Sequence, residues 1–229
     1  MLILAVESSG KPVSVAVYGS QGKLLGQYFQ NTGFSHSRTL LVLVDSLLKN
    51  LDLQLSDIGL IAVSNGPGSF TGVRIGVSAV KGLAWGADLP VCGVSALEAM
   101  VYQVLKPPGD HILISPVMDA RRDQVYNALF EWRDDSLHRL CNDRAVSIEE
   151  LAKDINDRNM PCILVGDGVK VCENAGSMSG CIIMPEPIRY QTAYGVALAA
   201  VNKDPISATD LEPVYLRPSQ AERIKAGSK

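Results

Sequence analysis

The sequence predicts an α/β fold made of two similar halves, and three observations support this. Apolar strand-like and helix-like segments follow the order β-β-β-α-β-α-β-α through the first 105 residues. The same order begins again after the turn-rich stretch KPPGD at 106–110. The openings of the halves also align, ESSGKPVSVAVY from Glu7 with DARRDQVYNALF from Asp119. Each places an acid first, a valine six residues later, an alanine three beyond it, and then an aliphatic and an aromatic residue.

The first half begins with three strands, because its apolar runs are short and separated by turn residues. The first of these strands is expected to end at the acid Glu7. The last helix has Ser95 as its expected N-cap and Glu98 at the capping-box position. Strands are predicted at 2–9, 13–20, 23–31, 60–68 and 89–95, and helices at 37–51, 71–86 and 95–105.

The second half repeats this order, and its first strand is expected to end at Asp119. Its first helix has Ser147 as the expected cap, with Glu150 three residues later. Strands are predicted at 111–120, 124–132, 136–146, 162–168 and 181–185, and helices at 147–159, 170–176 and 192–203.

Three antiparallel strands followed by parallel strands and interleaved helices form the ribonuclease H-like unit. Two such units in tandem give the actin-like (ASKHA) architecture, shared by sugar kinases and chaperone-type ATPases. We therefore predict two ribonuclease H-like lobes with mixed five-stranded sheets, a partner-binding lobe at 1–105 and a second lobe with a C-terminal tail at 106–229. In this architecture the acids that end the two first strands face a shared cleft, where they hold a metal–phosphate group.

The predicted cleft has lost half of its phosphate-binding residues. A phosphate hairpin needs glycine and hydroxyl residues, so that backbone N–H groups approach oxygen closely. ESSGK in the first half meets this need, but DARRDQ places Arg121 and Arg122 where backbone should meet phosphate. Glu7, Asp119 and Arg121 are therefore weak candidates for a cleft site. The three histidines form no HxxxH or HExxH pair, so no metal site is predicted.

The stretch SNGPGSFTGVRIG at 64–76 joins a strand to a helix through a glycine-rich loop. It matches neither the Walker loop nor the dinucleotide-binding pattern. Two interpretations stay open: a structural turn with Ser69 or Thr71 as N-cap, or a contact with a nucleotide or a partner's phosphate. The loop residues available for such a contact are Gly66, Gly68, Ser69, Thr71 and Arg74.

The helix at 71–86 has two apolar stripes, although packing on one sheet needs only one. The second stripe contains glycines, and each costs about 0.5–1 kcal/mol relative to alanine inside a helix. Close approach of a partner helix would compensate that cost, whereas the alternative is that the sheet is the close neighbour. Residues outside the main stripe of the helix at 37–51 would extend the same face. The predicted partner interface is Leu41, Val42, Leu48, Gly72, Ile75, Gly76, Ala79 and Gly82.

Composition limits the function further. The 229 residues are 47% hydrophobic with a net charge of −3, which disfavours autonomous nucleic-acid binding. An odd number of cysteines without a CxxC pair, and no leader or spanning run, indicate reduced thiols and a cytoplasmic location away from membranes. The basic C-terminal tail is either solvated or faces a nucleic acid, through Arg217, Arg223, Lys225 and Lys229.

Four stretches are together similar to the bacterial TsaB family over nearly the whole chain: GPGSFTGVRIG, AVKGLAWGADLPVCGVSALEAM, DARRDQVY and EPVYLRPSQAE. The resemblance implies a non-catalytic dimerisation subunit in the synthesis of threonylcarbamoyladenosine in tRNA. Such a subunit pairs through its N-terminal lobe with the catalytic TsaD, and works with the ATPase TsaE. The complex modifies the adenosine 3′ to the anticodon in tRNAs reading codons that start with A.

Further expectations follow from this resemblance. By this resemblance residues 66–76 correspond to the family's signature loop and helix. Asp119, Ala120 and Arg121 correspond to the family's motif in the second lobe. Alone, the chain is expected to form a homodimer, and it meets tRNA only through the complex. No tightly bound cofactor is expected, and a nucleotide at the partner interface is left open. Glu7 stands where the family commonly has aspartate, which weakens any metal or phosphate role there.

Two competing functions remain at this level. The first is an actin-class ATPase or small-molecule kinase, against which the DARRDQ hairpin argues. The second is a peptidase-like metalloenzyme, against which the scattered histidines argue.

Overall fold

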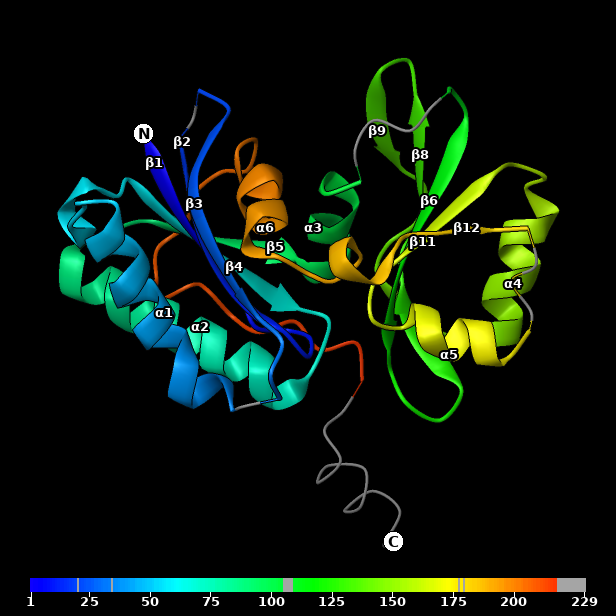
Figure 1. The fold of residues 1–229 in the computed structure, drawn as a ribbon, viewed down its shortest axis with the longest axis horizontal. Helices are drawn as coiled ribbons and strands as arrows, with labels where there is room; N and C mark the ends of the chain where they lie inside the picture. Colours follow the sequence, from blue (N-terminus) through cyan, green and yellow to red (C-terminus); the bar gives the residue numbers. More distant parts are fainter. Residues whose placement is uncertain (20, 34, 105–108, 177, 179, 218–229) are drawn as a thin grey trace, which may run out of the picture.

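The structure is a computed structural model that describes residues 1–19, 21–33, 35–104, 109–176, 178 and 180–217. The first sheet lies in the half of the molecule that contains the N-terminus (Figure 1). Its strand order is β3-β2-β1-β4-β5. Strand β1 pairs antiparallel with β2 and parallel with β4. The strands are β1 (Leu2–Glu7), β2 (Val13–Gly19), β3 (Lys23–Gln30), β4 (Leu60–Gly66) and β5 (Val91–Ser95).

The second sheet repeats this topology, with the order β10-β7-β6-β11-β12. Strand β6 pairs antiparallel with β7 and parallel with β11, as β1 does with β2 and β4. Glu7 and Asp119 therefore end equivalent strands, and the predicted actin-like tandem is confirmed. The strands are β6 (Ile112–Asp119), β7 (Gln124–Asn127), β8 (Phe130–Arg133), β9 (Ser136–Arg139), β10 (Arg144–Ser147), β11 (Cys162–Val165) and β12 (Ile182–Ile183).

Within the described residues the second sheet has seven strands rather than the expected five, because the predicted strands 124–132 and 136–146 are each split in two. The first split lies opposite Pro116 of β6, which has no N–H to donate to a neighbouring strand. The Asn127 side chain instead donates to the Pro116 carbonyl, at 3.0 Å, and to the Ser115 hydroxyl, also at 3.0 Å. Strand β7 consequently pairs with the end of β6, and β8 with its beginning.

Helices cover both faces of the first sheet. Helices α1 and α2 lie side by side on one face, where Leu40, Leu47 and Val77 join the core (Figure 1). Among the described residues the α-helices are α1 (His36–Asn50), α2 (Phe70–Ala87), α3 (Ala96–Tyr102), α4 (Ile148–Asp157), α5 (Val169–Asn174) and α6 (Ala193–Ala200). Two short 3₁₀ helices span Leu55–Asp57 and Glu186–Ile188.

The last helix of each half packs across the molecule. Helix α6 is the last helix of the second half, yet Val196 packs with Ile3 and Ala16 of the first sheet. Helix α3 ends the first half, yet Met100 packs with Phe130 of the second. The two halves therefore share core residues. The boundary predicted at 106–110 falls mostly outside the described residues, so the lobe limits 1–105 and 106–229 stay a prediction.

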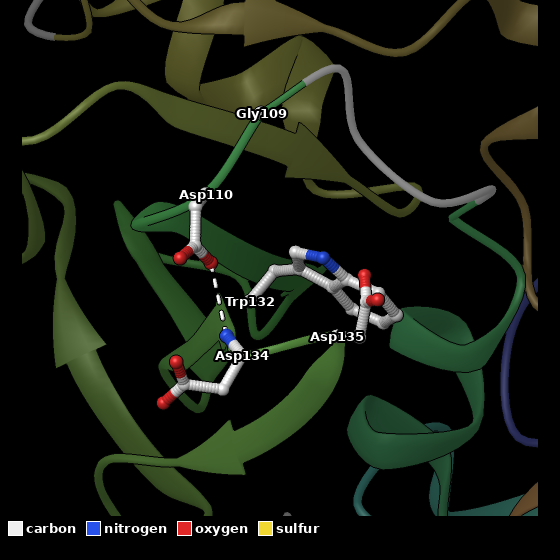
Figure 2. Close-up of a pocket in the computed structure, with 5 residues that line it drawn as sticks. All are labelled: Gly109, Asp110, Trp132, Asp134 and Asp135. Carbon is white, nitrogen blue, oxygen red and sulfur yellow. Dashed lines mark hydrogen bonds between the residues drawn. The ribbon is translucent and has the colours of Figure 1, made fainter.

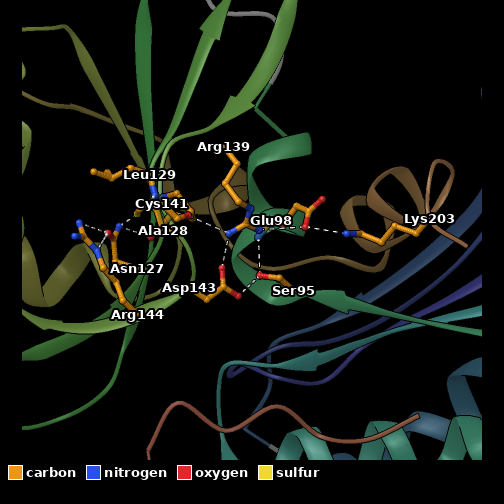
Figure 3. Close-up of polar contacts among 11 residues, drawn as sticks. Ser95, Glu98, Asn127, Ala128, Leu129, Arg139, Cys141, Asp143, Arg144 and Lys203 are labelled. Carbon is orange, nitrogen blue, oxygen red and sulfur yellow. Dashed lines mark hydrogen bonds and ion pairs between the residues drawn. The ribbon is translucent and has the colours of Figure 1, made fainter. Parts of the chain in front are cut away.

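A polar network holds α3 against the second sheet (Figure 3). Arg139 of β9 donates to Asp143 at 2.7 Å and to Glu98 of α3 at 3.1 Å. Lys203, beyond α6, also donates to Glu98, at 3.1 Å. Ser95 caps α3 as predicted, accepting the Glu98 N–H at 3.2 Å, while the Glu98 carboxylate binds these two cations. At α4 the full capping box of Ser147 and Glu150 forms.

The C-terminal strap, residues 206–217, runs back along the first half. Ile206 forms a bridge with Val91, and Leu211 is buried in the first core. Arg217 donates to the Ala120 carbonyl at 2.8 Å and is only partly exposed, and whether the tail faces tRNA stays a prediction. Arg223, Lys225 and Lys229 lie outside the described residues. No helix in the described ranges is both long and apolar enough to cross a membrane.

Candidate functional site

Helices α1 and α2 expose apolar side chains on the side away from the first sheet. Leu41 and Val42 of α1 are 51% and 62% exposed, and Trp85 of α2 is 67% exposed. A side chain added at Gly82 would meet nothing within 4 Å. We name Leu41, Val42, Ile75, Ala79, Gly82 and Trp85 the outer helix face; Ile75 and Ala79 are partly exposed. Trp85 was missed, although it follows Gly82 by three residues and so lies on the same helix face.

Three predicted interface residues do not lie on this face. Leu48 is only 8% exposed and packs in the first core. A Cβ at Gly72 would lie 2.1 Å from the Ser8 carbonyl oxygen, and one at Gly76 would lie 2.4 Å from Ser8 Oγ. The outward orientation predicted for these residues is therefore wrong. The two glycines let the hairpin after β1 pack directly against α2.

The signature loop is packed between two backbone segments. Gly66 has φ +133°, and a Cβ there would lie 2.2 Å from the Val214 carbonyl oxygen. At Gly68 a Cβ would lie 2.3 Å from the Ser9 carbonyl oxygen. Ser69 is the N-cap of α2, and its hydroxyl accepts the Gly72 N–H at 3.3 Å. These contacts support the structural interpretation of the loop, and Thr71 is exposed.

Arg74 connects α2 to the C-terminal strap. Its guanidinium lies 3.8 Å from the centroid of the Phe70 ring, and its Nε donates to the Tyr215 hydroxyl at 2.9 Å. The rings of Phe70 and Tyr215 stack with centroids 4.5 Å apart. Lys81 adds hydrogen bonds to the carbonyls of Thr209, at 3.2 Å, and Leu211, at 3.0 Å. Residues 70–81 of α2 thus contact residues 209–215 of the strap.

Glu7 is fully buried, and both of its carboxylate oxygens accept hydrogen bonds. Oε1 accepts from the Ser9 N–H and the Ser9 hydroxyl, each at 2.6 Å, and Oε2 accepts from the Ser64 hydroxyl. Burial raises the pKa of Glu7, although these hydrogen bonds oppose the shift. Asp119 is exposed and accepts the Arg121 N–H at 2.7 Å. Glu7 and Asp119 therefore differ in burial, and Asp167 interacts electrostatically with both of them.

A side chain from the second half fills the space beside the ESSGK hairpin. Gln191 is fully buried and donates from Nε2 to Asp167 at 3.3 Å. A Cβ at Gly10 would lie 2.8 Å from the Gln191 amide. Burial raises the pKa of Asp167, opposed by hydrogen bonds from Gln191 and from the backbone of Asp119. The hairpin is thus packed against Gln191 of the second half at Gly10.

A hollow lies at the turn between β8 and β9, far along the chain from the ESSGK hairpin. It has a volume of about 380 Å³ and is lined by Gly109, Asp110, Trp132, Asp134 and Asp135 (Figure 2). The Asp110 carboxylate accepts the Asp134 N–H at 3.0 Å, which ties this turn to the start of β6. In the described ranges no group of three or more His, Cys, Asp or Glu residues could hold a metal ion.

Comparison with known proteins identifies the family. The family model described as TsaD, tRNA N6-adenosine threonylcarbamoyltransferase, matches residues 30–209. The tRNA threonylcarbamoyladenosine biosynthesis protein TsaB of Bacillus subtilis (strain 168) is 30% identical over 228 residues, covering 97% of this chain and 96% of its own. The chain belongs to the TsaB family. The Escherichia coli (strain K12) TsaB protein is 28% identical over 234 residues, covering 100% of both chains.

A solved member has the same fold. YeaZ from Pseudomonas aeruginosa superposes with a TM-score of 0.78 at 25% identity, covering 94% of this chain and 99% of its own. The resemblance to the TsaB family drawn from the sequence is therefore confirmed.

Proposed function

We propose that this TsaB-family chain acts in tRNA threonylcarbamoyladenosine biosynthesis as a non-catalytic subunit. Its outer helix face binds a TsaD-type threonylcarbamoyltransferase. The exposure of Leu41, Val42 and Trp85 on two adjacent helices carries this proposal, because protein interfaces are enriched in exposed large apolar side chains. The names of the relatives, TsaB and biosynthesis of threonylcarbamoyladenosine, supply the pathway.

The partner's fold supports the same face. The TsaD family model matches residues 30–209 of this chain, a range that contains both α1 and α2. A partner of that family would carry a related helix pair, and two related faces can pack about a pseudo-twofold axis. The same symmetry lets two copies of this chain use the outer helix face as a homodimer when the partner is absent. Partner binding and self-association would then compete.

The cleft supports a non-catalytic role. Both Glu7 oxygens are occupied by hydrogen bonds, and Gln191 fills the space beside Gly10. An ATPase or kinase would need this hairpin open to phosphate. We therefore assign nucleotide hydrolysis to a TsaE-type ATPase of the assembly, and contact with tRNA to the complex, which works in the cytoplasm. A net charge of −3 fits a subunit that does not bind tRNA alone.

Substitution of Val42 by glutamate tests the proposal. A carboxylate forced into an apolar interface without a partner costs more than 1.4 kcal/mol, so affinity for a TsaD-type protein should fall ten-fold or more. The matched control is Ile188→Glu, because Ile188 is 54% exposed but lies in a 3₁₀ helix outside α1 and α2. Sedimentation velocity with and without the partner measures both. Equal binding by Val42→Glu and wild type would refute the assignment of this face.

The non-catalytic role has a separate test. The purified chain should not hydrolyse ATP or modify tRNA by itself. Hydrolysis that disappears in Glu7→Ala or Asp119→Ala would instead establish the ATPase alternative.

A further inference from the structure

Two cysteines from distant parts of the sequence lie opposite each other in the second sheet. Cys162 begins β11, and Cys181 immediately precedes β12. These strands are parallel, with Ile163 opposite Ile182, so the cysteines occupy matching positions one residue earlier. Neighbouring strands are about 4.7–4.9 Å apart. That spacing lies within the Cα separation of about 4.4–6.8 Å that a disulfide requires.

The two thiols are in contact and differ in their access to solvent. Cys162 is buried, whereas Cys181 is partly exposed. The two side chains interact, and this interaction shifts the pKa values of the two thiols in opposite directions. Both residues, with Met160, Pro161 and Gly180, line a surface hollow of about 310 Å³. A small reagent that enters this hollow therefore meets Cys181 first, with Cys162 directly behind it.

The contact also activates the outer thiol. The interaction with Cys162 lowers the pKa of Cys181 to about 7, although partial burial opposes the shift. The same interaction, together with burial, raises the pKa of Cys162. The lowered pKa favours the thiolate of Cys181, the form that reacts with oxidants.

We propose that Cys162 and Cys181 form a peroxide-reactive thiol pair that closes reversibly into an intramolecular disulfide. The Cys181 thiolate attacks one oxygen of hydrogen peroxide, the O–O bond breaks, and the departing hydroxide takes a proton to become water. The product at Cys181 is a sulfenic acid. Cys162 then attacks that sulfur, so that the S–S bond forms and the S–O bond breaks, while the Cys162 proton leaves with the hydroxide as a second water. Two thiols are thus oxidised by two electrons and one peroxide is reduced.

Two other cysteines serve as comparisons within the same chain. Cys172 packs in the same core cluster, but it is fully buried, and burial raises its pKa to about 11. We therefore expect Cys172 to react much more slowly than Cys181. Cys141 is partly exposed like Cys181, but its sulfur accepts the Leu129 N–H at 3.2 Å. Cys141 is the control for exposure alone.

Disulfide mapping of the full chain tests this proposal. The protein is treated at pH 7 with equimolar hydrogen peroxide, blocked with N-ethylmaleimide, digested and analysed by mass spectrometry. A peptide that links Cys162 to Cys181, and is lost on addition of dithiothreitol, is the expected result. A link from Cys181 to Cys172, or oxidation of Cys141 at the same rate as Cys181, would overturn the proposal.

Two variants separate the steps. In Cys162→Ala the sulfenic acid at Cys181 has no resolving thiol, so dimedone should trap it. Loss of the interaction with Cys162 should also slow formation of the sulfenic acid at pH 7, because the gain from more thiolate in the wild type exceeds its lower nucleophilicity. Cys141→Ala should leave the Cys162–Cys181 link unchanged. Failure of dimedone to label Cys181 in a Cys162→Ala chain with a wild-type circular dichroism spectrum would count against the mechanism.

Discussion

The glycines of α2 allow two identical substitutions to be compared at positions with opposite surroundings. At Gly76 an added Cβ would lie 2.4 Å from Ser8 Oγ and 3.4 Å from a methyl group of Val63. At Gly82 it would meet nothing within 4 Å. Both glycines lie inside the helix, which spans Phe70–Ala87. Gly76→Ala should therefore destabilise the isolated chain, and Gly82→Ala should stabilise it.

The magnitudes follow from the contacts. Replacing an interior helical glycine by alanine gains about 0.5–1 kcal/mol, and Gly82→Ala should show this gain alone. At Gly76 the methyl group must displace the Ser8 hydroxyl, which is buried and donates to the Gly72 carbonyl at 2.9 Å. Overpacking costs about 1–3 kcal/mol, and a buried hydroxyl left without a partner costs about as much again. After subtraction of the helix gain, the net effect at Gly76 is a loss of about 1–5 kcal/mol.

Urea unfolding followed by circular dichroism measures both variants. Because 1 kcal/mol shifts Tm by about 2–4 °C in a chain of this size, thermal unfolding should show opposite shifts of a few degrees. A Gly76→Ala chain as stable as wild type would refute the packing of α2 against the hairpin. The substitution that tests partner binding is therefore placed at Gly82, where an added side chain meets open space, rather than at Gly76. Gly82→Leu should keep the fold and weaken binding of a TsaD-type partner about ten-fold, whereas Gly76→Leu should unfold the chain.

Two further substitutions test the loop and the buried acid. Ser69→Ala should lower the free energy of unfolding by about 1 kcal/mol through loss of the helix cap, while the control Thr71→Ala should change it little; equal losses in urea titrations would contradict the assigned cap. Glu7 has a raised folded-state pKa, so its stabilising contribution is complete below pH 4.5 and is lost as pH rises through that folded pKa. Glu7→Gln cannot titrate, so the free energy of unfolding of wild type minus variant should decrease between pH 4 and 8. A difference that stays constant or grows would show that the Glu7 pKa is not raised.

Much of the fold could be predicted because local sequence patterns determine it. Apolar runs, caps and turn residues located nearly all of the strands and helices, and the repeat located Glu7 and Asp119 at equivalent strand ends. The split of the strand predicted at 124–132 could not be predicted from that segment. Its cause is Pro116, which lies on the neighbouring strand. The packing of α6 on the first half and of α3 on the second could not be predicted from the sequence either. A helix's apolar stripe does not specify which sheet it covers.

At the candidate site, too, the local sequence determines the orientation of some residues and not of others. A glycine inside a helix indicates that something approaches closely, but its sequence neighbours do not say what. In α2 the approaching group is the hairpin after β1, and Ser8 comes from more than sixty residues earlier in the chain. Exposure of Leu41 and Val42 could be predicted, because both lie outside the stripe that packs on the sheet. Gly72 and Gly76 also lie outside the main apolar stripe of their helix, yet the hairpin after β1 covers them. A glycine of α2 can therefore face a partner only where an added Cβ would meet open space, as at Gly82. The folded chain determines this property, and the helix alone does not.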